Sequence, residues 1–185
     1  MNWLKRNINI QWFLSIIVLF SLVACGDNNT SNNGPNEQVF DVSLYVGTYE
    51  GTWTNNTTGA TGAARIDIAV NESNKTATMT LDFDGKYLGL DDPPPTTLTG
   101  TYDSTGAKVK GKNDLFGEYD ITIDINGNIV GLVKQPANGT IPEITYTGII
   151  TKDKLDADYV VKLADGQTVS SILRMQKQNA GAIKY

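Results

Sequence analysis

The sequence contains no histidine and only one cysteine, Cys25, among its 185 residues. Without histidine the chain lacks the usual general base of serine and cysteine hydrolases, and it has no Gly-x-Ser-x-Gly motif. Zinc, haem and copper sites lose their commonest ligand for the same reason. We therefore expect a protein that is not an enzyme and that holds no metal ion or other cofactor.

A single cysteine also excludes a disulfide within the chain, so the burial of side chains alone has to stabilise the fold. Basic residues are few, because 15 lysines and arginines stand against 20 aspartates and glutamates, and the formal net charge is −5. These basic residues form no cluster in the sequence. Nucleic acid is therefore not an expected partner.

No long apolar run follows residue 24, and the apolar run that precedes it is short. Lys5 and Arg6 precede an apolar segment, residues 12–24, whereas a transmembrane helix needs about 20 apolar residues. A charged start, a short apolar core and a small residue at its end are typical of a secretory signal peptide. We expect residues 1–24 to be cleaved off, and an uncleaved membrane anchor is the less favoured alternative.

Leu22-Val23-Ala24-Cys25 ends this segment and resembles the lipobox of bacterial lipoprotein precursors, with Val23 in place of the usual small residue. The resemblance implies that the Cys25 thiol receives a diacylglycerol, that the bond before it is cut, and that acyl chains such as palmitate anchor the chain to a membrane. Two or three acyl chains bind far more durably than one. Gly26 stands where an aspartate would favour inner-membrane retention, which favours the outer membrane of a Gram-negative cell envelope.

Residues 26–38 contain almost only asparagine, glycine, serine and other polar residues. Such a segment cannot offset the entropy of ordering by burying apolar surface, so we expect residues 25–38 to be a flexible tether. The folded domain is expected to span residues 39–178, and residues 179–185 to be a C-terminal tail.

From Phe40 onward the apolar residues alternate with a period of two, which is typical of half-buried strands, and helical spacing is absent. Short turn signals separate the strands, and Asn126-Gly127 and Asp165-Gly166 predict hairpins with type I′ turns. Sequential pairing predicts an antiparallel meander. The candidate strands are residues 46–55, 64–71, 76–84, 96–103, 107–112, 118–126, 128–135, 143–152, 155–164 and 168–176.

Along each strand, every second residue is expected to face the interior. These inward positions hold bulky apolar residues together with glycines at positions 51, 100, 111 and 148. Glycine weakens a flat strand but permits the coiling that barrel closure requires. Closure also removes the exposed edges of a long sheet. We therefore predict an all-β fold with a single up-and-down antiparallel barrel of eight to ten strands.

Asp91-Asp92-Pro93-Pro94-Pro95 interrupts the meander, because three prolines cannot take part in a sheet ladder. This run is either a stiff connection or, together with residues 85–90, a lid over one mouth of the barrel.

Gly51-Thr52-Trp53, preceded by Gly47-Thr48-Tyr49, resembles the first strand of lipocalins and of the related avidin-like barrels. The resemblance implies an eight-stranded barrel whose first and last strands meet. It also implies that Trp53 closes the barrel base and that Arg174, from the last strand, packs across it. A β-sandwich or an unrelated barrel remains open, and no match to the biotin-binding side chains of avidin is found.

Five tyrosines fall on the inward parity: Tyr49, Tyr102, Tyr119, Tyr146 and Tyr159. Each joins an apolar ring to a hydroxyl that needs a partner when it is buried. They are candidate binding residues for a small, largely apolar ligand that enters near Tyr102 and the proline run. Alternatively, these rings fill a solid barrel, and the domain instead meets another envelope protein.

Overall fold

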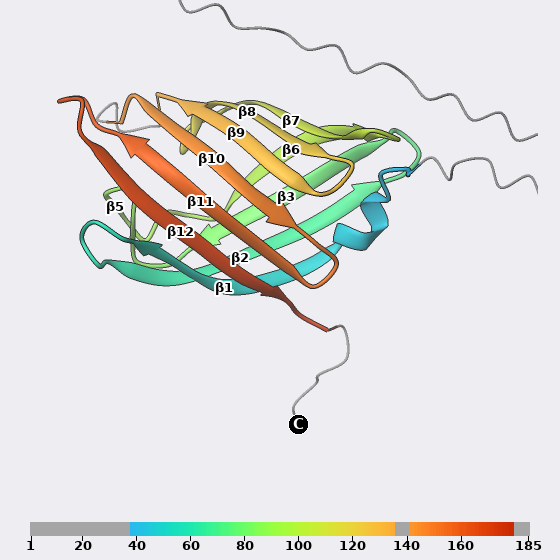
Figure 1. The fold of residues 1–185 in the computed structure, drawn as a ribbon, viewed down its shortest axis with the longest axis horizontal. Helices are drawn as coiled ribbons and strands as arrows, with labels where there is room; N and C mark the ends of the chain where they lie inside the picture. Colours follow the sequence, from blue (N-terminus) through green and yellow to red (C-terminus); the bar gives the residue numbers. More distant parts are fainter. Residues whose placement is uncertain (1–37, 136–140, 180–185) are drawn as a thin grey trace, which may run out of the picture. The chain divides into compact units, whose positions relative to one another are not determined.

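Ten strands of the protein pair edge to edge into a closed barrel (Figure 1). The computed structural model describes residues 38–135 and 141–179. The barrel strands are β1 (Gly47–Asn55), β2 (Thr61–Asn71), β3 (Thr76–Phe83), β6 (Thr96–Asp103), β7 (Gly106–Asn113), β8 (Gly117–Asp124), β9 (Asn128–Lys134), β10 (Glu143–Ile150), β11 (Lys154–Lys162) and β12 (Thr168–Lys177). A short 3-10 helix, η1 (Val42–Tyr45), precedes them, and β4 (Lys86–Tyr87) and β5 (Leu90–Asp91) form a separate two-stranded hairpin.

Each barrel strand pairs antiparallel with the next one along the chain, and the β4–β5 hairpin is inserted between β3 and β6. The first and last strands, β1 and β12, pair from Tyr49 opposite Lys177 to Asn55 opposite Ser171. At this seam Gly51 is required, because a side chain there would overlap the carbonyl oxygen of Arg174. The predicted meander and its closure are thus confirmed, with ten strands rather than the eight of the families that the sequence resembles.

Burial alternates along the strands as the sequence pattern predicts. On β2, for example, Ala64, Ile66 and Ile68 are buried inside the barrel, whereas Ala63 and Arg65 face solvent. The outer face carries threonines and ion pairs between neighbouring strands, such as Lys110 with Asp120 at 2.8 Å. Within the described residues, no helix is long and apolar enough to cross a bilayer.

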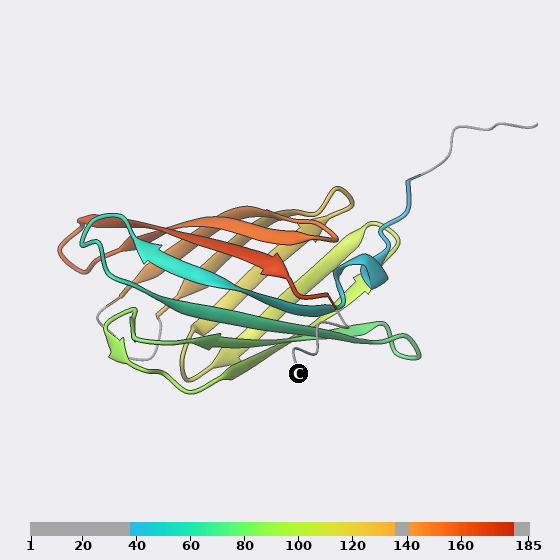
Figure 2. The ribbon, with the colours of Figure 1, turned by 90° about the horizontal axis from the view of Figure 1, so that it is seen from below.

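The barrel has two different ends, which Figure 2 shows on opposite sides. We call them the Tyr87 end, where the β4–β5 hairpin lies, and the η1 end, where η1 lies. The turns between β2 and β3, β6 and β7, β8 and β9, and β10 and β11 belong to the η1 end, because every second connection of a meander falls on the same side.

Residues 38–45 close the η1 end. The buried rings of Phe40 and Tyr45 pack against each other, with their centroids 5.3 Å apart. The Phe40 amide donates to the carbonyl of Ser104 at 2.9 Å, in the turn between β6 and β7. Tyr49 donates its hydroxyl to the carbonyls of Tyr45 and Thr151, both at 3.2 Å. The segment before β1 is therefore part of the folded domain.

The two strongest turn signals form hairpins, but the predicted type I′ geometry is wrong at both. Only the glycines adopt positive φ, 81° at Gly127 and 85° at Gly166, whereas Asn126 and Asp165 do not. The amides of these glycines donate to Asp124 and Leu163, three residues earlier. Each turn therefore has three residues and ends in a left-handed glycine, which is the second common hairpin geometry.

Candidate ligand-binding site

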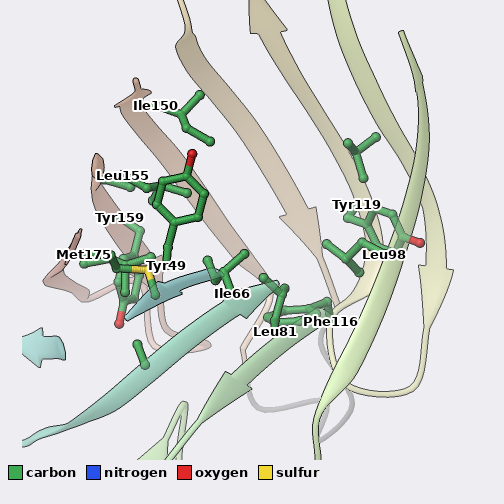
Figure 3. Close-up of a cluster of buried hydrophobic side chains, with 14 of the residues drawn as sticks. Tyr49, Ile66, Leu81, Leu98, Phe116, Tyr119, Ile150, Leu155, Tyr159 and Met175 are labelled. Atoms are coloured by element: carbon green, nitrogen blue, oxygen red, sulfur yellow. The ribbon is translucent and has the colours of Figure 1, made fainter. Parts of the chain in front are cut away.

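A cavity of about 90 Å³ lies at the centre of the barrel, and aliphatic and aromatic side chains line it almost entirely. Figure 3 shows side chains from opposite walls, among them Ile66 and Leu98, that project toward this centre. The aromatic residues that border the cavity are Phe83, Tyr87, Phe116, Tyr119, Tyr146 and Tyr159. Each arrives on a different strand or connection, so only closure of the barrel brings them together.

The cavity is small for a ligand site. Its volume of about 90 Å³ is well below the roughly 300–1,000 Å³ that pockets for small molecules usually span. In the conformation described here, side chains therefore fill most of the barrel.

Tyr87 accounts for much of this filling. It extends from the β4–β5 hairpin into the barrel and is only 2% exposed. Its ring stacks on Phe83 with centroids 4.2 Å apart and meets the Trp53 ring edge-on at 5.5 Å. Such stacked and edge-to-face pairs stabilise by about 0.5–1.5 kcal/mol beyond the burial of area. Tyr87 thus acts as a plug at its end of the barrel.

The ring of Tyr87 lies 6.2 Å from that of Tyr159, which stacks on Tyr146 with centroids 5.3 Å apart. Tyr159 also lies opposite Ser171, the one buried polar residue of the described barrel besides the tyrosines. Hydrogen bonding among these side chains contributes to the pKa shifts of Tyr87 and Tyr159. Burial raises the pKa of Tyr87 well above its usual 10.0, and burial also raises the pKa of Tyr146 and of Tyr159. All three side chains are therefore neutral at physiological pH. We call Tyr146, Tyr159 and Ser171 the hydroxyl cluster.

A second hollow of about 500 Å³ lies at the Tyr87 end, on the outer side of the plug. Trp53, Asn55, Leu88, Ile141 and Val161 are among the residues that line it. Tyr159 borders both this mouth pocket and the central cavity. Tyr87 lines the central cavity and stands beside Tyr159 with ring centroids 6.2 Å apart, so it lies next to the residue that the two hollows share.

Three of the five predicted tyrosines, Tyr119, Tyr146 and Tyr159, border the central cavity, and two do not. Tyr49 is fully buried toward the η1 end, where its hydroxyl is bonded to backbone carbonyls. Tyr102 lies under Lys75, whose Nζ is 5.5 Å from the ring centroid, and its hydroxyl is buried without a hydrogen-bond partner among the described residues.

The predicted entrance near Tyr102 and the proline run is wrong, because the two lie at opposite ends of β6. The prolines precede Thr96 at the Tyr87 end, and Tyr102 is next to the last residue of the strand. Seven residues of extended chain separate Pro95 from Tyr102, which is roughly 23 Å at about 3.3 Å per residue.

The expected packing of Arg174 across Trp53 is also corrected. The strands that carry these residues do pair, but Trp53 lies opposite Leu173, and Arg174 falls on the outer parity. Arg174 is exposed and donates to the Asp158 carboxylate at 2.6 Å and to the Ala157 carbonyl at 2.8 Å. The indole of Trp53 instead donates to the carbonyl of Asp84 at 2.9 Å, at the base of the hairpin.

Sequence reasoning missed Tyr87, because the segment around it was interpreted only as a connection or a lid. The available signal was an aromatic residue between Gly85 and Gly89 in a stretch that is too short for a barrel strand. Cys25, residues 26–37 of the tether and the tail from residue 180 lie outside the described residues.

The described barrel offers no cluster of three or more acidic or thiol side chains that could hold a metal ion. No protein-family model matches the chain, and no curated protein matches it either.

Proposed function

We propose that this domain is a non-enzymatic binding protein for a small, largely apolar ligand. The observation that carries the proposal is the arrangement of two hollows, an apolar central cavity and a mouth pocket, on either side of one side chain. Displacement of Tyr87 joins them into a space of the size that small-molecule sites usually have. The lipocalin-like first strand supports this function by analogy of fold alone.

We also propose that the chain is a lipoprotein of the cell envelope, held by acyl chains on Cys25 and facing the periplasm or the cell surface. The support is the signal-peptide pattern of residues 1–24 and the lipobox that ends it. Radiolabelled palmitate tests this directly, since Cys25 is the only thiol. Cys25→Ser is expected to abolish labelling and Ser31→Ala, in the predicted tether, to leave it unchanged; continued labelling of Cys25→Ser contradicts the proposal.

The binding function is tested by a substitution that fills the cavity. Ala157 lines the cavity and is 6% exposed, so Ala157→Leu places about three further carbon atoms in it. Ala63→Leu makes the same change on the outer face, where the residue is exposed. Small molecules that copurify with the chain are extracted and quantified by mass spectrometry.

We expect at least a tenfold lower ligand content for Ala157→Leu than for Ala63→Leu, because about 1.4 kcal/mol of lost binding free energy already corresponds to a factor of ten. Equal contents in the two variants, or no copurifying molecule with the unmodified chain, count against the proposed function.

A second function is favoured by the small volume of the cavity and by the outer wall. Val130 and Val160 are 60% and 42% exposed on β9 and β11, which flank β10. A solid barrel that contacts another envelope protein through this wall is the alternative. Pulldown from solubilised envelope at low and high salt tests it, and absence of a specific partner at both salt concentrations rejects it.

A further inference from the structure

The β4–β5 hairpin contacts the barrel through the buried Tyr87 side chain and through Leu88, which packs against the edge of the core. Its strands pair with each other, Lys86 with Asp91 and Tyr87 with Leu90, and form a sheet separate from the barrel. The amides of Tyr87 and Asp92 both donate to the carbonyl of Gly85, at 3.0 and 2.9 Å. An isolated two-stranded hairpin is at best marginally stable in water, so packing against the barrel, with Tyr87 as its most deeply buried residue, holds this one in place.

Backbone strain is concentrated in the same segment. Leu88 and Asp92 adopt left-handed φ values of 52° and 47°, although neither is a glycine. Such a conformation costs roughly 1–2 kcal/mol for an ordinary residue. Gly85, at a φ of 81°, precedes the hairpin and can absorb a change of direction without that cost. Displacement of the hairpin from the barrel would let Leu88 and Asp92 leave these φ values, so the strain favours displacement of Tyr87.

The seat of Tyr87 has the chemistry of a binding site for a hydroxylated aromatic ring. Phe83 supplies a stacking face, Trp53 supplies an edge contact, and the hydroxyl cluster receives the phenolic group. The central cavity extends this seat into the barrel. The mouth pocket borders it on the outer side, where the hairpin forms one wall and Trp53, Ile141 and Val161 belong to the part that remains when the hairpin moves. A ligand with an apolar substituent on its ring could therefore occupy more of the space than Tyr87 does.

The seat also excludes charge. The buried residues of the described barrel include no lysine, arginine, aspartate or glutamate. A buried carboxylate without a partner carries a large desolvation cost, whereas a neutral hydroxyl costs little when it is hydrogen-bonded. A fatty acid is therefore a poor match, and a neutral phenol is a good one.

We propose that Tyr87 occupies the position of the ligand, and that the ligand is a neutral, apolar-substituted phenol that displaces the β4–β5 hairpin and bonds to the hydroxyl cluster. This inference rests on the proposed binding function and names its ligand class. Tyr87 then competes with the ligand inside the same chain, which weakens binding in proportion to the fraction of time that the seat is filled.

The test compares 4-butylphenol with its methyl ether, 4-butylanisole, and with 4-butylbenzoate, by calorimetric titration of the full chain. We expect the phenol to bind at least about tenfold more tightly than either analogue, since the ether cannot donate a hydrogen bond and the benzoate is charged. Binding is also expected to change the fluorescence of Trp53, which contacts Tyr87. Loss of this change in Trp53→Phe distinguishes it from a response of Trp3 or Trp12.

Two matched pairs of variants separately test the competition between Tyr87 and the ligand and the contact of the ligand with the hydroxyl cluster. Tyr87→Ala is expected to tighten phenol binding at least about tenfold. Asp91→Ala, at an exposed position of the same hairpin that lines neither hollow, is expected to leave it unchanged. Tyr146→Phe is expected to remove the preference for phenol over ether, whereas Tyr102→Phe, away from the cavity, keeps it.

Equal affinities for phenol and ether, in the unmodified chain and in Tyr87→Ala, overturn the ligand class while the apolar pocket stands. Equal phenol affinities of Tyr87→Ala and Asp91→Ala overturn the competition between Tyr87 and the ligand. If no probe binds to the unmodified chain or to Tyr87→Ala, this inference is overturned. The proposed binding function is then decided by the copurification experiment with Ala157→Leu.

Discussion

Arg174 and Met175 are adjacent in β12 and point to opposite faces of the sheet. Arg174 is exposed and paired with Asp158, whereas Met175 is 1% exposed within the barrel. Family resemblance predicted a closing role for Arg174, but the two-residue period of the strand places its neighbours Leu173 and Met175 inside. Parity along a strand is thus a stronger guide to side-chain direction than a resemblance carried by three residues.

Alanine substitution of Arg174 and of Met175 compares how much the outward and the inward side chain contribute to stability. We expect Arg174→Ala to lower the free energy of unfolding by less than about 1 kcal/mol, because exposed ion pairs contribute little. Met175→Ala is expected to cost about 2–5 kcal/mol, since it leaves a cavity in the core. Urea unfolding compares the two, and a larger loss for Arg174→Ala contradicts the outward placement.

The buried tyrosines predict a dependence of stability on alkaline pH. Burial raises the pKa of Tyr49 to about 12 and raises those of Tyr45, Tyr87, Tyr146 and Tyr159 as well. Because the folded state holds these protons more tightly than the unfolded state, their contribution is complete below pH 10 and is lost as the pH rises from 10 toward 12 and beyond.

We therefore expect the midpoint of urea unfolding to fall steeply above pH 10. The tyrosinate absorbance that comes from these five tyrosines should appear together with the loss of structure rather than before it. Full ionisation of the tyrosines at pH 11 in a still folded chain would contradict their burial.

At the scale of the element, the turn between β8 and β9 shows what a dipeptide signal can and cannot predict. Asn126-Gly127 correctly located the hairpin, but the sequence did not distinguish a two-residue turn from a three-residue turn. Asp124 decides the geometry, since its carboxylate accepts from the amides of Asn126 and Asn128 at 2.8 and 2.9 Å. The hydrogen bonds of the residue before the turn thus matter as much as the dipeptide.

Substitution of each residue of this dipeptide distinguishes the two geometries. Gly127→Ala is expected to destabilise the protein by about 1–3 kcal/mol, because Gly127 has a φ of 81° and an added Cβ overlaps the Ile150 carbonyl oxygen. Asn126→Ala is expected to cost less than about 0.5 kcal/mol, as at an ordinary surface position. Similar large losses for both variants in thermal unfolding would instead indicate a type I′ turn.

The β4–β5 hairpin is the element that sequence reasoning could not place. The ten candidate strands could be located because apolar and polar residues alternate along each of them, and this alternation is visible from neighbouring residues alone. The inward direction of Tyr87 depends on the shape of the space between Phe83, Trp53 and Tyr159, which exists only after the barrel has closed. For the same reason the candidate site was predicted only in part.

At the scale of the whole molecule, the barrel depends on the segment that covers its η1 end. Phe40 is 6% exposed there, although it precedes the first strand by seven residues, and adjacent Val39 is 61% exposed. Sequence alone placed the start of the domain here because the apolar pattern begins at Phe40. It could not predict the contact with the turn after β6, which is distant in sequence.

This closure yields a prediction with an adjacent control. Phe40→Ala is expected to lower the free energy of unfolding by about 3 kcal/mol, near the lower limit for buried aromatic residues, and Val39→Ala by less than about 0.5 kcal/mol. Urea unfolding of both chains provides the comparison. Equal stability of the two variants would mean that residues 38–45 do not close the barrel in solution.

An even number of antiparallel strands returns the chain to the side on which it entered. Gln38 contacts Asn126, and Gln178 bonds to Thr48, so both limits of the domain lie beside η1. The opening beside Tyr87 is at the far side, roughly 25–30 Å away for strands of about nine residues. A surface or fusion partner joined through either terminus therefore leaves that opening unobstructed.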